Sequence, residues 1–199
     1  MAHIDYYFTP VSPWAYLGSL RFIEIVKRHG ASVRVMPVDL GKVFETSGGL
    51  PLARRPPQRQ AYRLMDLKRW RDFLDMPLVL QPRTFPVDAG PASRLIIAAR
   101  EAGQDTLFLS HLLGRAIWAE ERNIADPDTL EEIVTEAGLD PAPLFRAADG
   151  EAVKAAMQAD TDRAIAAGVF GAPTYDIDGE LFWGQDRLDF VERALAGRV

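Results

Sequence analysis

Ile4-Asp5-Tyr6-Tyr7-Phe8 is followed directly by Thr9-Pro10-Val11-Ser12-Pro13. The first segment is rich in aromatic and β-branched residues and predicts a buried strand, while the second contains helix and strand breakers and predicts a loop. Apolar residues then recur at helical spacing as far as His29-Gly30, and Val33 to Val38 predicts a second strand. Strand, helix and strand in this order indicate a βαβ unit with parallel strands.

A second pair of strands is expected near the end of the chain. Thr174 to Ile177 and Glu180 to Trp183 flank Asp178-Gly179, which is typical of a hairpin with a type I′ turn. Apolar residues between Leu188 and Leu195 then predict a last helix. A βαβ unit followed by ββα is the thioredoxin-like topology, so we expect an α/β fold of the thioredoxin-like class.

The middle of the chain predicts helices. Between residues 56 and 166 the apolar residues form stripes at helical spacing, which we interpret as core. Asp126-Pro127 predicts one helix start, because aspartate is a common N-cap and proline suits the first helical position. We therefore expect residues 1–55 and 167–199 to form a thioredoxin-like domain, interrupted by a helical insertion domain over residues 56–166.

The composition excludes several classes of function. The chain has 199 residues and a net charge of −5, so nothing in its charge favours nucleic acid or an anionic membrane surface as a partner. No apolar run approaches the ~20 residues that a membrane-spanning helix needs. The first residues lack the features of a signal peptide, and we expect a soluble cytoplasmic protein.

The sequence contains no cysteine. Disulfides, thiolate metal ligands and a cysteine nucleophile are therefore excluded, and the three histidines lie in separate segments, so we expect no metal site. Thioredoxin-like proteins carry a Cys-x-x-Cys pair at the start of the first helix, where this chain has Ser12 and Ala15. Thiol chemistry at this site would need a thiol that arrives with a ligand.

Ser12 and Pro173 are the first two candidate site residues. A helix N-terminus offers free N–H groups to an anion or a thiolate, and Ser12 stands at one, although an ordinary N-cap is the alternative. Pro173 follows Ala172 just before the ββα end, where thioredoxin-like folds have a cis-proline facing that helix. The residue before such a proline can pair with an extended peptide. The alternative is a trans-proline that opens a strand.

Gln185 and Asp186 are the third candidate, as a polar end for a zwitterionic ligand. The alternative is that Asp186 caps the final helix. Glutathione suits all three segments, because it is a small extended peptide with a thiol and a zwitterionic γ-glutamyl end. Ser12 has no visible base to activate its hydroxyl, so we expect it to donate a hydrogen bond to the bound thiolate and lower the pKa of the thiol.

Together these motifs resemble the 2-hydroxychromene-2-carboxylate isomerases, which belong to the DsbA-like superfamily and are close relatives of kappa-class glutathione transferases. The resemblance covers nearly the whole chain in the right order. The matching stretches are Tyr7 to Tyr16, Arg59 to Trp70, Pro82 to Pro86, Gly168 to Thr174, and Phe182 to Leu188.

The resemblance implies a role for each matching residue. Ser12 would be the catalytic residue that faces the glutathione sulfur, and Ala172 would pair with the cysteinyl backbone. Kappa transferases also use an asparagine and a lysine after the second strand, but Ser47 to Pro51 contains no asparagine, and Arg59 would stand in for the lysine. The residues implied to bind glutathione are Ser12, Arg59, Ala172, Pro173, Gln185, Asp186 and Arg187.

The implied reaction interconverts 2-hydroxychromene-2-carboxylate and trans-o-hydroxybenzylidenepyruvate, a step of naphthalene-type aromatic catabolism. Addition of the glutathione sulfur to the unsaturated ketone would turn its double bond into a single bond, and rotation and elimination would return glutathione unchanged. Kappa-class relatives are dimers, so we also expect a homodimer. The expected contacts of the small aromatic carboxylate substrate are Tyr62, Arg83, Phe85 and Trp118, with Arg54, Arg55 and Arg59 as further carboxylate candidates.

Several alternatives remain open at this point. The three aromatic residues could equally pack in the core, and any of the arginines could be a surface charge. The same site could serve a kappa-like transferase that consumes glutathione, or the chain could be a non-catalytic thioredoxin-like binding module. A DsbA-type oxidoreductase is excluded, because the chain has no cysteine.

Overall fold

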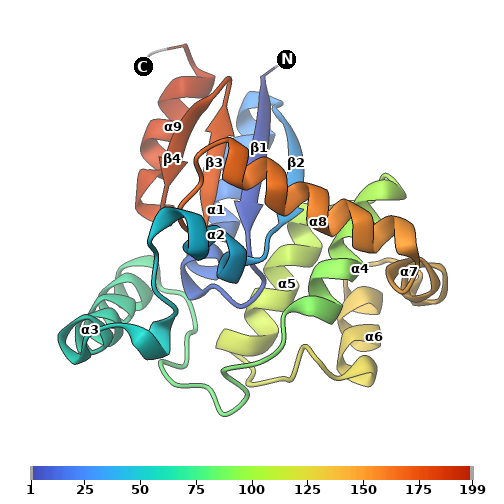
Figure 1. The fold of residues 1–199 in the computed structure, drawn as a ribbon, viewed down its shortest axis with the longest axis horizontal. Helices are drawn as coiled ribbons and strands as arrows, with labels where there is room; N and C mark the ends of the chain where they lie inside the picture. The colour runs from blue at the N-terminus through green and yellow to red at the C-terminus, as the bar shows by residue number, and fades with distance from the viewer. Residues whose placement is uncertain (1, 198–199) are drawn as a thin grey trace.

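The computed structural model describes residues 2–197. Met1 and residues 198–199, which the expected thioredoxin-like domain includes, lie outside the described residues. Four strands form one sheet in the order β2-β1-β3-β4, with β1 parallel to β2 and antiparallel to β3 (Figure 1). The predicted βαβ and ββα units therefore share a sheet, and the thioredoxin-like fold is confirmed. The strands are β1 (His3–Phe8), β2 (Ser32–Pro37), β3 (Thr174–Ile177) and β4 (Glu180–Trp183).

Helices surround this sheet and fill the segment between β2 and β3. The first helix ends as predicted at Gly30, whose φ of 58° is the left-handed conformation of a glycine C-cap. The helix α2 was not predicted. The helices are α1 (Pro13–His29), α2 (Leu40–Ser47), α3 (Pro57–Leu74), α4 (Gly90–Glu101), α5 (Thr106–Trp118), α6 (Pro127–Glu136), α7 (Pro141–Ala148), α8 (Glu151–Ala166) and α9 (Leu188–Leu195), with short 3₁₀ segments at Leu52–Arg54 and Gln185–Arg187.

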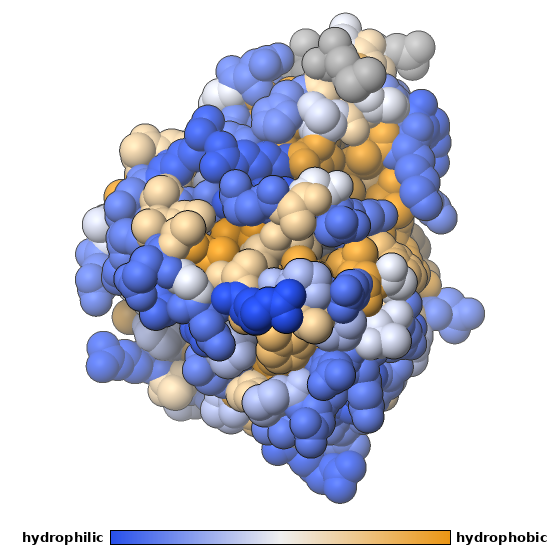
Figure 2. Space-filling model, turned by 90° about the vertical axis from the view of Figure 1, so that its right-hand side faces the viewer, coloured by the Kyte–Doolittle hydropathy of each residue, from blue (hydrophilic) through white to orange (hydrophobic). Residues whose placement is uncertain are grey.

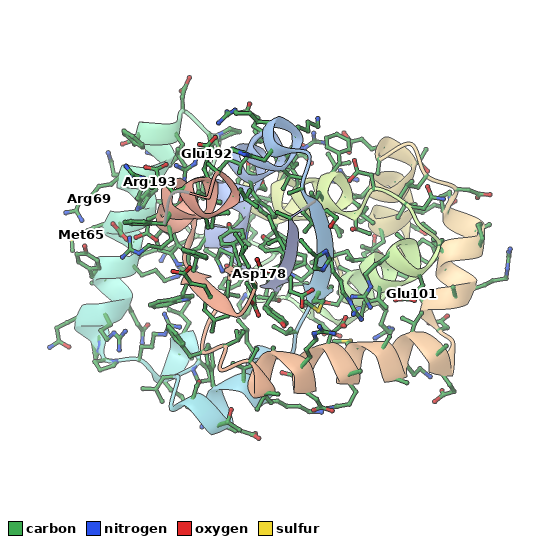
Figure 3. All side chains as sticks on the ribbon, turned by 90° about the horizontal axis from the view of Figure 1, so that it is seen from above. Met65, Arg69, Glu101, Asp178, Glu192 and Arg193 are labelled. Carbon is green, nitrogen blue, oxygen red and sulfur yellow. The ribbon has the colours of Figure 1, made fainter. Side chains whose placement is uncertain are left out.

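The two faces of the sheet pack against different helices, because successive strand residues point to opposite sides. On one face Tyr6 stacks on Tyr175 and contacts Phe22 of α1, with ring centroids 5.2 and 4.9 Å apart. On the other face Tyr7 belongs to a buried cluster with Ala164 of α8. Seen from above, α8 runs along one side of the sheet, and α1 and α9 lie on the other (Figure 3). The division into residues 56–166 and the rest stays a prediction.

Local turn and capping signals account for the connections. Asp178 and Gly179 both have positive φ, 53° and 89°, as a type I′ turn requires, and the predicted hairpin is confirmed. Asp126 accepts a hydrogen bond from the backbone N–H of Thr129 at 2.9 Å, so the predicted N-cap of α6 is also confirmed.

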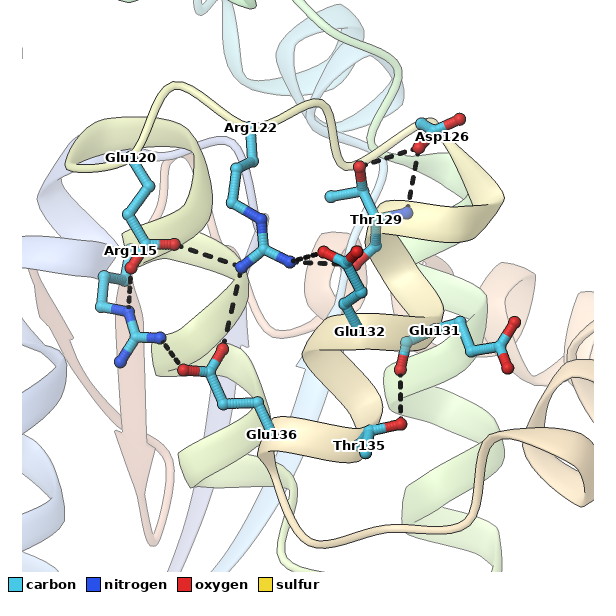
Figure 4. Close-up of polar contacts among 9 residues, drawn as sticks. All are labelled: Arg115, Glu120, Arg122, Asp126, Thr129, Glu131, Glu132, Thr135 and Glu136. Atoms are coloured by element: carbon cyan, nitrogen blue, oxygen red, sulfur yellow. Dashed lines mark hydrogen bonds and ion pairs between the residues drawn. The ribbon is translucent and has the colours of Figure 1, made fainter.

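An ion-pair network ties α5 to α6 (Figure 4). Arg122 lies between Glu120 and Glu132 at 3.2 and 2.9 Å, and Arg115 pairs with Glu120 at 2.7 Å and with Glu136. The surface on the side of α6 and α7 is mostly hydrophilic, with apolar side chains showing between charged ones (Figure 2). Among the residues described, none of the helices combines the length and the apolar character that crossing a membrane requires.

Candidate functional site

A cleft of about 600 Å³ lies where α3, the N-terminus of α1 and the loops flanking the β3–β4 hairpin meet. Its size is that of a pocket for a small molecule. Residues far apart in the sequence line it together, and most of the implied glutathione contacts are among them. The lining residues are Trp14, Arg55, Gln58, Arg59, Tyr62, Arg63, Asp66, Trp70, Ala172, Trp183, Gly184, Gln185, Asp186 and Arg187.

Ser12 is the N-cap of α1, two residues before the cleft-lining Trp14. Its Oγ accepts a hydrogen bond from the backbone N–H of Ala15 at 3.2 Å, and Pro13 occupies the first helical position. A hydroxyl has one proton to donate besides its acceptor sites, and no hydrogen bond donated by Ser12 is found among the described residues. Ser12 is therefore an N-cap whose own proton has no acceptor among the described residues, but the serine is buried and is not among the residues that line the cleft.

The Ala172–Pro173 peptide bond is cis, as the resemblance implies, so the trans alternative is wrong. The carbonyl of Pro173 accepts the N–H of Gly184 at 2.9 Å, which joins this loop to the one after β4. Gly171 packs so closely on the indole of Trp183 that a Cβ there would lie 2.4 Å from Nε1. Ala172 lines the cleft, and its main chain makes no hydrogen bond to other described residues. An extended peptide could therefore pair with it.

The segment after β4 presents Asp186 to the cleft. Gly184 has a φ of 104°, and a Cβ there would lie 2.4 Å from the Asp186 Oδ1, so only glycine fits this turn. Asp186 lies in a 3₁₀ turn, pairs with Arg187 at 2.9 Å, and makes no capping hydrogen bond to α9. The capping alternative for Asp186 is wrong. Gln185 is buried, and its side-chain oxygen accepts a hydrogen bond from Arg21 at 2.6 Å.

Charged side chains make the cleft positive. Four arginines and two aspartates line it, although the whole chain carries a net charge of −5. Arg59 and Arg63 lie four residues apart on α3 and so share one face of that helix. Burial, together with the charge of Arg55, lowers the pKa of Arg63 to about 10, which leaves its guanidinium protonated at neutral pH. The cleft therefore suits an anionic ligand.

Three of the four expected substrate contacts do not line the cleft. Tyr62 does, but Arg83 has a side chain 84% exposed and pairs with Glu121 at 3.4 Å. Trp118 is fully buried, and Phe85 packs on it with ring centroids 4.9 Å apart. Contact of these three residues with a substrate stays a prediction. Among the residues described, no group of histidine, aspartate and glutamate side chains is arranged to hold a metal ion.

Sequence reasoning missed Arg63, Trp14 and Trp70 as lining residues. The spacing of Arg55, Arg59 and Arg63, each four residues from the next, was the signal that could have found Arg63.

The DSBA-like thioredoxin domain family matches residues 3–196. This chain belongs to that family. Within it, a 2-hydroxychromene-2-carboxylate isomerase of Sphingobium xenophagum is 31% identical over 96% of this chain and 97% of its own length. The glutathione S-transferase kappa 1 of Caenorhabditis elegans is 24% identical over 96% of this chain and 89% of its own.

A solved structure of a 2-hydroxychromene-2-carboxylate isomerase superposes on this DsbA-like protein with a TM-score of 0.75 and 26% identity. The alignment covers 98% of this chain and 95% of that one. The similarity therefore extends over the sheet, the helices between β2 and β3, and the C-terminal ββα unit, and it includes all the segments that line the cleft.

Proposed function

We propose that this DsbA-like protein is a glutathione-dependent isomerase that interconverts 2-hydroxychromene-2-carboxylate and trans-o-hydroxybenzylidenepyruvate. Relatives of that name, aligned over nearly the full length, support an isomerase. The observation that carries the proposal is the positive cleft that joins the cysteine-free start of α1 to the cis-proline loop. Such a cleft can bind a thiol-bearing peptide beside an anionic substrate.

The residues present fit glutathione. The main chain of Ala172 would pair with its cysteinyl unit, and the carboxylate of Asp186 would bind its α-amino group. Arg59 and Arg187 line the same cleft and would bind its carboxylates. When bound, glutathione supplies a nucleophilic sulfur that adds reversibly to the unsaturated ketone and so frees its double bond to rotate.

Ser12 would hold the sulfur as a thiolate. Its Oγ already accepts the Ala15 N–H, and its proton is left to donate to the sulfur. The N-terminus of α1 adds the positive end of a helix dipole, which favours the anionic form of the thiol. Ser12 therefore acts as a hydrogen-bond donor in this proposal and has no role as a nucleophile.

The cationic side of the cleft would stabilise the negative charge of the substrate. Its carboxylate, and the enolate oxygen that forms on addition, both need N–H donors. Tyr62 lies exposed at the cleft and can contact the aromatic ring. A glutathione-dependent enzyme would work in the cytoplasm, because reduced glutathione is maintained there. We also propose that the protein forms a homodimer.

The test is the isomerisation rate of 2-hydroxychromene-2-carboxylate with and without glutathione, with free thiol titrated at the end. A rate that depends on glutathione and consumes no thiol is expected. Loss of thiol would instead support a transferase, which the similarity to the kappa-class enzyme makes the second candidate. No rate under either condition would contradict the isomerase.

A further inference from the structure

Arg63 of α3 lies over an aromatic floor. Its guanidinium carbon is 5.7 Å from the ring centroid of Trp118 and 5.9 Å from that of Phe85. The two rings are packed together, and Trp118 is fully buried in the core. A planar guanidinium at these distances is attracted by the ring faces, which limits how its side chain can turn. The position of the charge is therefore set by the core of the protein.

This guanidinium has no acceptor among the residues that the structure describes. The side chain of Arg63 makes no hydrogen bond and no ion pair there, and the same holds for Arg59, which is exposed to solvent. The other two arginines of the cleft are engaged: Arg55 donates to the carbonyl of Leu50 at 2.8 Å, and Arg187 pairs with Asp186 at 2.9 Å. Arg63 is also half-buried and stays charged at neutral pH. A partly desolvated charge without a counter-ion is costly to a protein. Arg63 lines a cleft in which an anion could supply the missing partner.

We propose that Arg63 binds the carboxylate of the aromatic substrate and so determines specificity for acids over their uncharged analogues. This inference rests on the proposed function. Arg63 reaches toward Phe85 and Trp118, whereas the proposed glutathione contacts Ala172 and Asp186 belong to the loops flanking the β3–β4 hairpin. Arg63 therefore lies on the α3 side of the cleft, one helical turn from Arg59, and across from the loops that carry Ala172 and Asp186. Arg83, the arginine expected from the sequence, is paired with Glu121 outside the cleft.

A pair of matched probes tests this assignment on the full chain saturated with glutathione. Cinnamate and cinnamamide have the same aromatic skeleton, but only cinnamate carries a charge. Calorimetry should find that the wild-type protein binds cinnamate about 10- to 100-fold more tightly, the range expected for a charge-assisted bidentate contact. Arg63→Gln should abolish this preference. A wild-type protein without the preference, or an Arg63→Gln variant that keeps it, would overturn the inference.

Three further variants make the result specific. Arg71→Gln removes a charge from the same helix at a position that pairs with Asp72 outside the cleft, and it should keep the preference. Arg63→Lys should reduce it, because an ammonium group lacks the planar fork of arginine. If Arg63→Gln does not fold, an unchanged preference in Arg63→Lys overturns the inference. Loss of the preference in Arg83→Gln would assign the carboxylate to Arg83 and would also overturn it.

Arg63 could bind either the carboxylate of the substrate or the glycyl carboxylate of glutathione, and the glutathione affinity distinguishes the two. This affinity should be unchanged in Arg63→Gln. A loss as large as that for cinnamate would place the glycyl carboxylate of glutathione on Arg63 and overturn the substrate assignment. The isomerisation assay reports separately on the proposed function. An inactive wild-type protein that still prefers cinnamate through Arg63 would contradict the isomerase and leave the anion site standing.

Discussion

The Nη2 of Arg21 donates two hydrogen bonds to Gln185, one to its main-chain carbonyl at 2.7 Å and one to its side-chain oxygen at 2.6 Å. The two residues belong to α1 and to the turn before α9. Close packing reinforces the link, because a Cβ at Gly18 would lie only 2.7 Å from the Cβ of Gln185. The guanidinium of Arg21 also lies 5.8 Å from the ring centroid of the cleft-lining Trp70. Arg21 thus fixes the turn that presents Asp186 to the cleft.

Arg21→Met should weaken glutathione binding while the fold is retained. Methionine keeps the apolar part of the side chain but removes both hydrogen bonds, so the turn that carries Asp186 loses its anchor. Loss of charge-assisted hydrogen bonds of this kind costs about 1.5–3 kcal/mol, and we expect the affinity to fall about tenfold or more. Calorimetric titration with glutathione measures it.

The matched control for Arg21 is Arg28→Met. Arg28 lies on the same helix but pairs with Glu192 on the surface. Its glutathione affinity should equal that of the wild-type protein. An unchanged affinity in Arg21→Met would show that Asp186 does not depend on this anchor.

The sequence predicts those parts of the fold whose signals are local. These signals depend on residues within a few positions of each other. They are the strand segments rich in aromatic and β-branched residues, the type I′ turn at Asp178-Gly179 and the helix cap at Asp126. The turn after β4 could not be predicted from local signals. Aspartate is a common helix cap, but Asp186 lies in a 3₁₀ turn that Arg21 of α1 holds in place. That contact joins residues 164 positions apart, and no local pattern contains it.

The candidate site also has residues that the sequence predicted and residues that it did not. Motif resemblance found Ala172, Pro173 and Asp186, and it implied the cis peptide bond before Pro173 that the structure has. The resemblance could not predict that Trp118 is buried in the core or that Arg83 pairs with Glu121. A sequence pattern does not say which side of a helix or loop lines the cleft. The four-residue spacing of Arg59 and Arg63 places both on one helix face, but it does not say that this face lines a cleft.

Ser12→Ala should remove most of the isomerase activity with little loss of stability. The cap hydrogen bond to Ala15 is worth about 1 kcal/mol, whereas the proposed hydrogen bond from Ser12 to the thiolate acts on the reactive group itself. We expect the rate to fall at least about tenfold, as for other hydrogen bonds to a charged group. The steady-state rate and the midpoint of denaturant unfolding measure the two effects.

Asp126→Ala controls for the cap at Ser12. It removes an aspartate N-cap from α6, outside the cleft lining, and should cost a similar amount of stability. Its rate should equal that of the wild-type protein. If the two variants lose the same small amount of activity, Ser12 is a cap without a catalytic role.

Asp186→Asn should raise the dissociation constant of glutathione about tenfold or more. The amide keeps the size of the side chain but removes the negative charge that would attract the α-amino group. Asp189→Asn makes the same change in the first turn of α9, outside the cleft lining, and should leave the affinity unchanged. Equal affinities for all three proteins would remove Asp186 from the glutathione site.

A homodimer should form at micromolar concentration, and α3 offers a surface for it. Met65 and Phe73 of this helix are each more than half exposed, and Met65 and Arg69 lie on its outer side (Figure 3). Such apolar exposure is typical of an interface. Sedimentation equilibrium should give twice the mass of the chain for the wild-type protein and a lower mass for Phe73→Asp. A wild-type monomer would contradict the dimer, and a dimeric Phe73→Asp would place the interface elsewhere.

His111 should make the protein less stable as the pH falls below about 6.5. Burial lowers the pKa of this histidine below its usual 6.5, and the positive charge of Arg115 lowers it further. The unfolded chain therefore binds a proton more readily than the folded one, and the free energy of unfolding rises with pH in this range. The stabilisation is fully present above pH 6.5 and is lost as the pH falls through the lowered pKa of the folded state.

The hydrogen bonds around His111 suggest the variant that tests this. The hydroxyl of Ser19 donates to the carbonyl of Tyr16 at 2.6 Å, so its Oγ accepts from the Nδ1 of His111, which lies 2.8 Å away. Asparagine can make the same hydrogen bond but does not titrate. Denaturant unfolding of both proteins between pH 5 and 8 should give a flatter dependence for His111→Asn, whatever its absolute stability. Parallel curves would mean that other groups cause the loss of stability in acid.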